Sequence, residues 1–166
     1  YDIMTAGFIA SILQFVQAGV LLPVTDLVKK YDWGKGAAWE YEGENWYYPF
    51  DYNLVVNYYR KDLYAQKGLK VPETSDDFLK NCQALTVVNS GNVDVGGCVI
   101  PLASDSATNW ASFGNMFAEG TQLYDKDWNV VLDQGENVDR ATRFLDLYGE
   151  LYKTMPPGMN AVGYAQ

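Results

Sequence analysis

Residues 48–63 read YPFDYNLVVNYYRKDL, and this stretch decides the fold that the sequence predicts. Its first part contains the turn-forming residues Pro49, Asp51 and Asn53. A run rich in β-branched and aromatic residues follows at 54–59 and predicts an extended segment. From Arg60 to Lys67 the sequence fits a short helix, and Gly68 is placed to end it. A turn, a strand and a helix are therefore expected in succession.

Outward from this stretch, strands and helices alternate. Apolar periodicity with capping and stop residues predicts helices at 8–18, 25–30, 74–85, 106–119 and 137–153. Short apolar or β-rich runs predict extended segments at 1–5, 45–49 and 98–102, and a small hairpin at 125–132. The last helix has the clearest apolar stripe, formed by Val138, Ala141, Leu145, Tyr148 and Tyr152. The alternation is typical of the α/β class.

The composition argues against several classes of function. The chain has 166 residues and a net charge of −9, and an acidic surface repels nucleic acid and anionic membranes. It has no histidine, which removes Ser-His-Asp and Cys-His catalysis and the commonest transition-metal ligand. Its 13 Tyr and 5 Trp favour a surface that stacks on flat apolar faces, although any single ring is more often a core residue. We expect no cofactor, no metal and no nucleic-acid partner.

The ends of the chain show no targeting signal. No initiator Met precedes Tyr1, and no basic region follows it. The end of the chain at Gln166 shows no stop signal either. The longest apolar run, at 8–22, is too short and too polar to span a bilayer. We therefore expect a chain truncated at both ends, with its signal sequence missing.

A series of short motifs runs through the chain in a fixed order. They are Tyr1–Met4, Gly19–Pro23, Tyr48–Asn53, Tyr59–Leu63, Gly68–Thr74, Asp77-Phe78, Ala84–Thr86, Ala118–Gly120 and the helix at 138–152. This ordered set resembles family 1 of the bacterial extracellular solute-binding proteins, the group that includes maltose-binding protein. Ser75 stands where that family usually has Trp, and Gly120 is single where two glycines are common. Both departures fall at capping or turn positions.

The resemblance implies a two-lobed fold of the periplasmic-binding-protein-like type II, present here as a fragment. Residues 1–50 would belong to the N-terminal lobe, 51–53 to an inter-lobe crossover and 54–166 to the C-terminal lobe. It also implies a monomeric periplasmic or cell-surface lipoprotein. Such a protein captures a sugar or oligosaccharide in the cleft and delivers it to the permease subunits of an ABC transporter. The resemblance further implies that the protein is not an enzyme.

The crossover is the first expected part of the ligand site. Aromatic side chains stack on the apolar faces of a sugar, while Asp, Asn, Glu and Arg bind its hydroxyls. The resemblance implies that Asp51, Tyr52 and Asn53 face the cleft. Asn53 falls where relatives place a ligand-binding acid or amide. An ordinary Asx turn is the alternative for these residues.

The remaining site residues are expected on other segments. Trp110 matches a ligand-stacking aromatic of the family, with a core tryptophan as the alternative. Its neighbour Asn109 either contacts the ligand or caps the helix. Phe8 follows the first predicted strand and is either a ligand contact or the first core residue of its helix. Tyr164 is expected on the final inter-lobe segment.

The cysteines, Cys82 and Cys98, lie on a predicted helix and on the extended segment that follows it. These elements are expected to pack together, so the thiols can pair as a disulfide in an oxidising compartment. Closing that loop contributes roughly 3 kcal/mol by chain entropy. The alternative, two small buried hydrophobes, remains open.

Two other functions compete with sugar binding. One is a solute-binding protein for a polyamine, a phosphate ester or a metal chelate. A phosphate ligand calls for Arg or Lys near the loops, whereas Arg60 and Lys61 lie past the crossover. The other is a carbohydrate-active enzyme that uses paired carboxylates such as Asp51 and Asp105. The sequence contains no recognisable catalytic motif for it.

Overall fold

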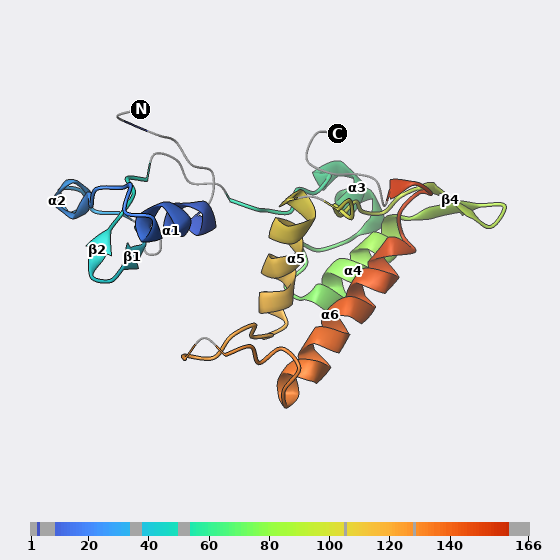
Figure 1. The fold of residues 1–166 in the computed structure, drawn as a ribbon. Coiled ribbons are helices and arrows are strands. Elements are labelled where there is room, and N and C mark those ends of the chain that lie inside the picture. Colours follow the sequence, from blue (N-terminus) through green and yellow to red (C-terminus); the bar gives the residue numbers. More distant parts are fainter. Residues whose placement is uncertain are drawn as a thin grey trace. The chain divides into compact units, whose positions relative to one another are not determined.

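The computed structural model describes residues 3, 9–33, 38–49, 54–104, 106–127 and 129–159. The chain forms two compact units, Tyr1–Leu54 (unit 1) and Val55–Gln166 (unit 2) (Figure 1). Within the described ranges the fold is a mixture of helices and strands, and the strands form two separate antiparallel pairs. No helix in these ranges is both long and apolar enough to cross a membrane.

Unit 1 is built from short elements. They are the helices α1 (Ile9–Gln17) and α2 (Thr25–Val28) and the strands β1 (Glu40–Tyr41) and β2 (Glu44–Asn45). Gly19 follows α1 with a φ of 67°, the left-handed conformation expected of a helix-ending glycine. The strands pair Glu40 with Asn45 and Tyr41 with Glu44. The predicted helix at 8–18 is confirmed over its described part, and only Asn45 of the predicted extended segment at 45–49 lies in a strand.

Asn45 links the parts of unit 1. Its buried side-chain amide donates a hydrogen bond to the Trp39 carbonyl at 3.0 Å, and its own carbonyl accepts from the Val24 N–H at 2.7 Å. Its N–H donates to the Thr25 hydroxyl at 2.8 Å, and that hydroxyl donates to the Glu44 carboxylate. Because a buried polar group without partners is costly, these bonds fix α2 against the β1–β2 hairpin.

Unit 2 is centred on one long helix. Its elements are α3 (Lys61–Lys67), α4 (Ser75–Leu85), β3 (Val87–Asn89), β4 (Asn92–Val95), α5 (Ser106–Ala118) and α6 (Glu136–Tyr152). Both α4 and α5 pack against α6, and α3 packs against α4 (Figure 1). The buried core consists of Cys82, Ile100, Met116, Phe144, Tyr148, Leu151 and Met155. The helices predicted at 60–67, 74–85, 106–119 and 137–153 are confirmed. Each observed end lies at the predicted residue or one residue away from it.

Local signals set these helix ends. The hydroxyl of Thr74, the N-cap of α4, accepts from the Asp77 N–H at 3.1 Å. A separate hydrogen bond, from the Thr74 side chain to the Asp77 carboxylate, is the main reason why the pKa of Asp77 lies below its ordinary value. Gly68 ends α3 with a φ of 65°, and Gly120 follows α5 with a φ of 80°.

The buried face of α6 differs from the predicted stripe. Phe144, Tyr148 and Leu151 are buried, whereas Leu145 is 65% exposed. Val138 and Tyr152 are exposed as well, so only Tyr148 is a buried member of both sets. Neighbouring stripes on a helix are about 100° apart, and in α6 both the predicted stripe and the buried stripe carry apolar residues. The packing of α4 and α5 selects the stripe that is buried.

The prediction of strands at 54–59 and 98–102 is wrong. Residues 54–59 have no strand and are exposed, and residues 98–102 have no strand either. The second segment is bonded to the end of α6 instead. The Gly97 N–H donates to the Thr154 carbonyl at 3.0 Å, and the Ile100 N–H contacts Met155 Sδ at 3.4 Å. A β-rich composition indicates an extended chain, but a strand also needs a neighbouring strand.

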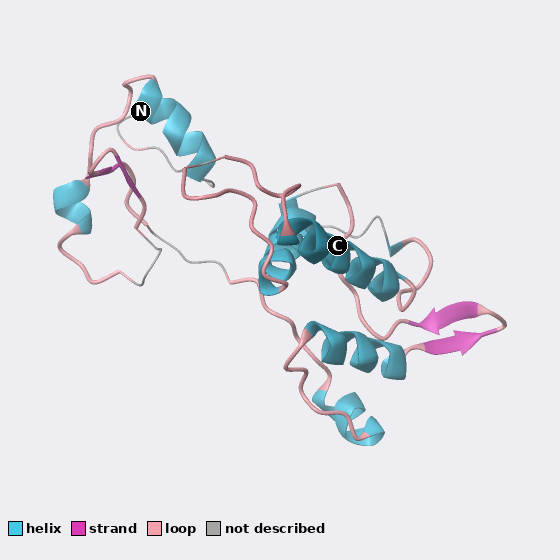
Figure 2. Ribbon diagram, turned by 90° about the horizontal axis from the view of Figure 1, so that it is seen from below, coloured by secondary structure: helices cyan, strands magenta, loops and turns pink. Residues whose placement is uncertain are grey.

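The hairpin of unit 2 lies in a segment from which no strand was predicted. β3 and β4 are antiparallel and extend away from the helices (Figure 2). Ser90 and Gly91 join them with φ values of 50° and 82°, the positive values that a two-residue hairpin turn of the primed type requires. Asn89 pairs with Asn92 across this turn.

Gly97 provides a test of the packing. A Cβ at this position would lie 1.7 Å from the Cys82 carbonyl oxygen, whereas a Cβ at Gly149 on α6 meets nothing within 4 Å. We expect Gly97→Ala to destabilise the protein by more than about 2 kcal/mol, since backbone must move. The matched control Gly149→Ala should stabilise it by roughly 0.5–1 kcal/mol, through helix propensity. Denaturant unfolding measures both, and equal effects of the two substitutions would contradict the packing described.

Candidate ligand-binding site

The structure describes two of the predicted ligand-binding residues, Asn109 and Trp110. Both lie in the first half of α5 and are exposed. The others, Phe8, Asp51, Tyr52, Asn53 and Tyr164, lie outside the described residues. The arrangement of Asn109 and Trp110 relative to the crossover segment therefore remains a prediction.

Trp110 belongs to an aromatic face of α5 that sequence analysis missed. Trp110 is 39% exposed, Phe113 44% and Phe117 52%. Their spacing of three and four residues places them on one side of the helix. The rings of Phe113 and Phe117 are stacked, with centroids 6.2 Å apart and planes 16° apart. We call these three residues the aromatic face.

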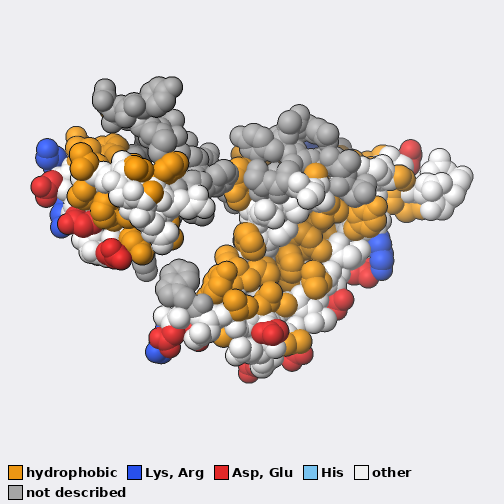
Figure 3. Space-filling view, viewed as in Figure 1, with side chains coloured by type: hydrophobic (Ala, Val, Ile, Leu, Met, Phe, Trp, Pro, Cys, Tyr) orange, Lys and Arg blue, Asp and Glu red, His pale blue; other side chains and the backbone are white. Residues whose placement is uncertain are grey.

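The other side of α5 packs into unit 2. Met116 is buried there, and the Asn115 side-chain amide donates to the Tyr148 hydroxyl of α6 at 2.9 Å. This bond fixes the rotation of α5 about its axis, so the aromatic face is turned away from α6. Figure 3 shows hydrophobic side chains gathered on the surface over α5 and α6. The signal in the sequence was the recurrence of large rings among small residues in NWASFGNMF.

A concavity adjoins the C-terminal end of this face. Its volume is about 730 Å³, and it is lined by Phe117, Thr121, Gln122, Leu123, Tyr124, Asp125 and Lys126. Thr121 is 3% exposed, and its hydroxyl has no hydrogen-bond partner within the described residues. The concavity is shallow and open to solvent, and its lining is mainly apolar with a few polar groups.

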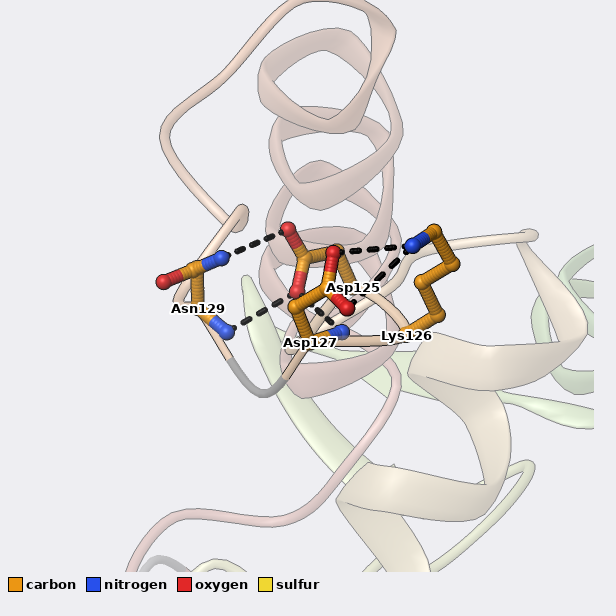
Figure 4. Close-up of polar contacts among 4 residues, drawn as sticks. All are labelled: Asp125, Lys126, Asp127 and Asn129. Atoms are coloured by element: carbon orange, nitrogen blue, oxygen red, sulfur yellow. Dashed lines mark hydrogen bonds and ion pairs between the residues drawn. The ribbon is translucent and has the colours of Figure 1, made fainter.

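A tight turn forms the rim of the concavity. Asp125 Oδ1 accepts from the N–H groups of Asp127 at 2.8 Å and Asn129 at 2.9 Å (Figure 4). Asp125 Oδ2 accepts from the Asn129 side-chain amide at 3.0 Å. These bonds, led by that from the Asn129 side chain, lower the pKa of Asp125. The predicted hairpin at 125–132 is thus reduced to a turn with one bridge, between Tyr124 and Val130.

The start of α6 supports the concavity from behind. Arg140 donates to the Gly120 carbonyl at 3.0 Å and forms an ion pair with Glu136 at 2.7 Å. Asn137 accepts from the Gln122 N–H at 3.1 Å and donates to the Val131 carbonyl at 2.9 Å. The segment that lines the concavity is therefore tied to α6 at both of its ends.

The thiols of Cys82 and Cys98 are close to each other in unit 2. Cys82 is 2% exposed and Cys98 is half-buried, and both are free thiols in the structure. Cys98 Sγ lies 3.1 Å from the Thr154 hydroxyl. A hydrogen bond between the two thiols raises the pKa of Cys82 and lowers that of Cys98. The disulfide expected from the sequence stays a prediction.

The turn predicts a specific pH dependence. The pKa of Asp125 is lowered on folding, so its stabilising contribution is present above its unfolded pKa of about 3.9 and is lost as the pH falls through its folded pKa. We expect Asp125→Asn to lower the thermal midpoint at pH 7, because the amide nitrogen that replaces Oδ2 cannot accept from the Asn129 side chain, and to have a smaller effect near pH 3. Asp127→Asn is the control. A midpoint difference that is equal at the two pH values would contradict this role of the carboxylate.

Comparison with known proteins gives one match. The family described as bacterial extracellular solute-binding protein matches residues 1–166, which include both units and the aromatic face. No curated protein and no solved structure matches the chain significantly.

Proposed function

Since the chain belongs to the bacterial extracellular solute-binding protein family, we propose that it captures a sugar or oligosaccharide for an ABC importer. The family has an extracellular solute-binding role in transport, and its members are typically not enzymes. It implies a periplasmic or cell-surface location, a periplasmic-binding-protein-like fold and membrane transporter subunits as partners. The sugar ligand, the ABC type of the transporter and the lipid anchor belong to our proposal.

The aromatic face of α5 is the observation that carries the sugar proposal. Three large rings on one side of a helix are held at the surface although the other side of that helix reaches the core. A contiguous exposed apolar surface is typical of a binding site. Flat, partly exposed rings suit the apolar faces of pyranose sugars, and Asn109 beside Trp110 supplies an amide for hydroxyl groups.

The rest of the proposed site comes from the crossover. In the proposal, residues 1–50 and 54–166 belong to two lobes, with Asp51, Tyr52 and Asn53 between them and Phe8 and Tyr164 on adjoining segments. The division of the chain into compact units at Leu54 and Val55 supports this boundary. Planar carboxylate and amide groups from the crossover then bind the edge of a sugar whose face stacks on Trp110.

A phosphate ester is less well supported as the ligand. The guanidinium of Arg60 binds Asp62 through two hydrogen bonds, at 2.8 Å and 2.6 Å. Asp62 raises the pKa of Arg60, and Arg60 in turn lowers the pKa of Asp62 to about 2. Both side chains are exposed, so this pair adds little stability, but it occupies the cation that follows the crossover most closely in the sequence.

Trp110 gives the direct test of the sugar proposal. Isothermal titration of the full-length protein against mono- and oligosaccharides should identify a ligand that is bound and not converted. We expect Trp110→Ala to weaken that binding by roughly 5- to 150-fold, since a stacking ring contributes about 1–3 kcal/mol by analogy with bases on aromatic side chains.

The control is Tyr152→Ala, which removes another exposed aromatic ring, on α6. It should leave affinity unchanged. Unchanged affinity of Trp110→Ala for a bound sugar would remove the aromatic face from the site. Hydrolysis of the sugar would refute the proposal in favour of an enzyme.

A further inference from the structure

We propose that Cys82 and Cys98 form a dithiol redox site, in which Cys98 reacts first with a disulfide and Cys82 then closes the intramolecular bridge. The proposal concerns a second chemistry of unit 2 and does not depend on which solute is bound. The extracellular location implied by the family supplies the oxidising conditions that such a reaction requires.

The close approach of the backbone brings the two cysteines together. Gly97 lies so near to Cys82 that a Cβ on it would be 1.7 Å from the Cys82 carbonyl oxygen. Cys98 is the next residue, and it packs against the core cluster that contains Cys82. Adjacent Cα atoms are about 3.8 Å apart, so the Cα atom of Cys98 lies about that far from Gly97, the residue whose backbone contacts Cys82.

Hydrogen bonds to the end of α6 hold this approach in place. The Thr154 carbonyl accepts from the Gly97 N–H at 3.0 Å and from the Thr86 hydroxyl at 3.4 Å. The Thr86 hydroxyl also donates to the Cys82 carbonyl at 2.7 Å. The segment before Cys98 and the end of α4 are therefore tied to the same residue.

The environments of the two thiols differ in a way that orders the reaction. Cys82 is buried, whereas Cys98 is only half-buried and is the more exposed residue of the pair. The hydrogen bond from Cys82 favours the thiolate of Cys98 and lowers its pKa, with a smaller contribution from the Thr154 hydroxyl. The thiolate is the nucleophile in disulfide exchange, so Cys98 is the thiol that attacks.

The first step converts Cys98 into a mixed disulfide. The Cys98 thiolate attacks one sulfur of a disulfide RS–SR, forms the Cys98–SR bond and releases RS⁻. Hydrogen bonding to Cys98, burial and the charge on Cys98 all raise the pKa of Cys82, in that order. The charge on Cys98, and the hydrogen bond to its thiolate, are lost when the mixed disulfide forms.

The second step closes the bridge. Cys82 gives its proton to the released RS⁻ and attacks Cys98 Sγ, which forms the Cys82–Cys98 bond and releases the second RS⁻. In sum, two cysteine thiols are oxidised by two electrons and RS–SR is reduced to two thiols. The bridge closes the loop that carries the β3–β4 hairpin.

The experiment treats the reduced full chain with oxidised glutathione, and separately with an oxidised thioredoxin-fold dithiol protein. Mass spectrometry should find loss of both free thiols and no glutathione left on the chain. Cleavage at Asp94, which separates Cys82 from Cys98 in the sequence, should leave peptides joined until a reductant is added. The bridged chain should unfold at a midpoint higher by roughly 5–10 °C, as expected for a loop of this size.

Two matched variants test the order of reaction. Cys82→Ala should accumulate a glutathione adduct at Cys98, whereas Cys98→Ala should stay unmodified at the buried Cys82 until it unfolds. Reaction of the unmutated chain with either oxidant supports the site and identifies the source of the disulfide. Bridge formation with neither oxidant, or faster adduct formation in Cys98→Ala than in Cys82→Ala, would overturn it. Sugar titration of the reduced chain tests the binding function separately.

Discussion

The Thr154 carbonyl is the point on which the packing of unit 2 depends. It accepts hydrogen bonds from Gly97 and from Thr86, so the end of α6, the segment after β4 and the end of α4 meet there. Thr154 is buried, and a buried carbonyl without partners is costly. The close contact of Gly97 with Cys82 follows from this meeting and leaves no room for a side chain at position 97. Met155, the next residue, then reaches the core cluster.

The helices could be predicted from the sequence because their signals are local. The cap at Thr74 and the glycines that follow α1, α3 and α5 act within one helical turn of the ends that they define. The buried side of α6 could not be predicted in this way. Leu145 and Phe144 are adjacent and both apolar, and only the arrival of α4 and α5 decides that Phe144 is buried. Strands are harder still, because residues 54–59 and 98–102 have strand-like composition but lack a strand neighbour among the described residues.

The same distinction applies to the candidate site. Trp110 and Asn109 were predicted as site residues from the order and spacing of family motifs, which compare this chain with others and require no knowledge of its packing. The concavity was not found, because it arises where Thr121 follows the end of α5 and the turn at Asp125 folds back against α6. Phe113 and Phe117 were missed for a different reason. A helical row of rings has the same pattern on a core face and on a surface face, and the sequence does not say which face is covered.

The aromatic face and the cysteine pair are supported by α6 at different places. α5 is oriented through the bond from Asn115 to Tyr148, about one turn before the end of α6, while the cysteines depend on Thr154 just beyond that end. In our proposals, a ligand on Trp110 would meet a helix oriented by the first contact, and a disulfide would constrain a loop held by the second. Each contact adjoins the same buried cluster, since Tyr148 and Cys82 are members of it and Cys98 packs against it. A bond that stabilises one end of α6 therefore makes it harder for the whole buried cluster to come apart, because the side chains of a closely packed core restrict one another's movement. The bridge that we propose would therefore act on the same cluster that supports the aromatic face, without touching that face.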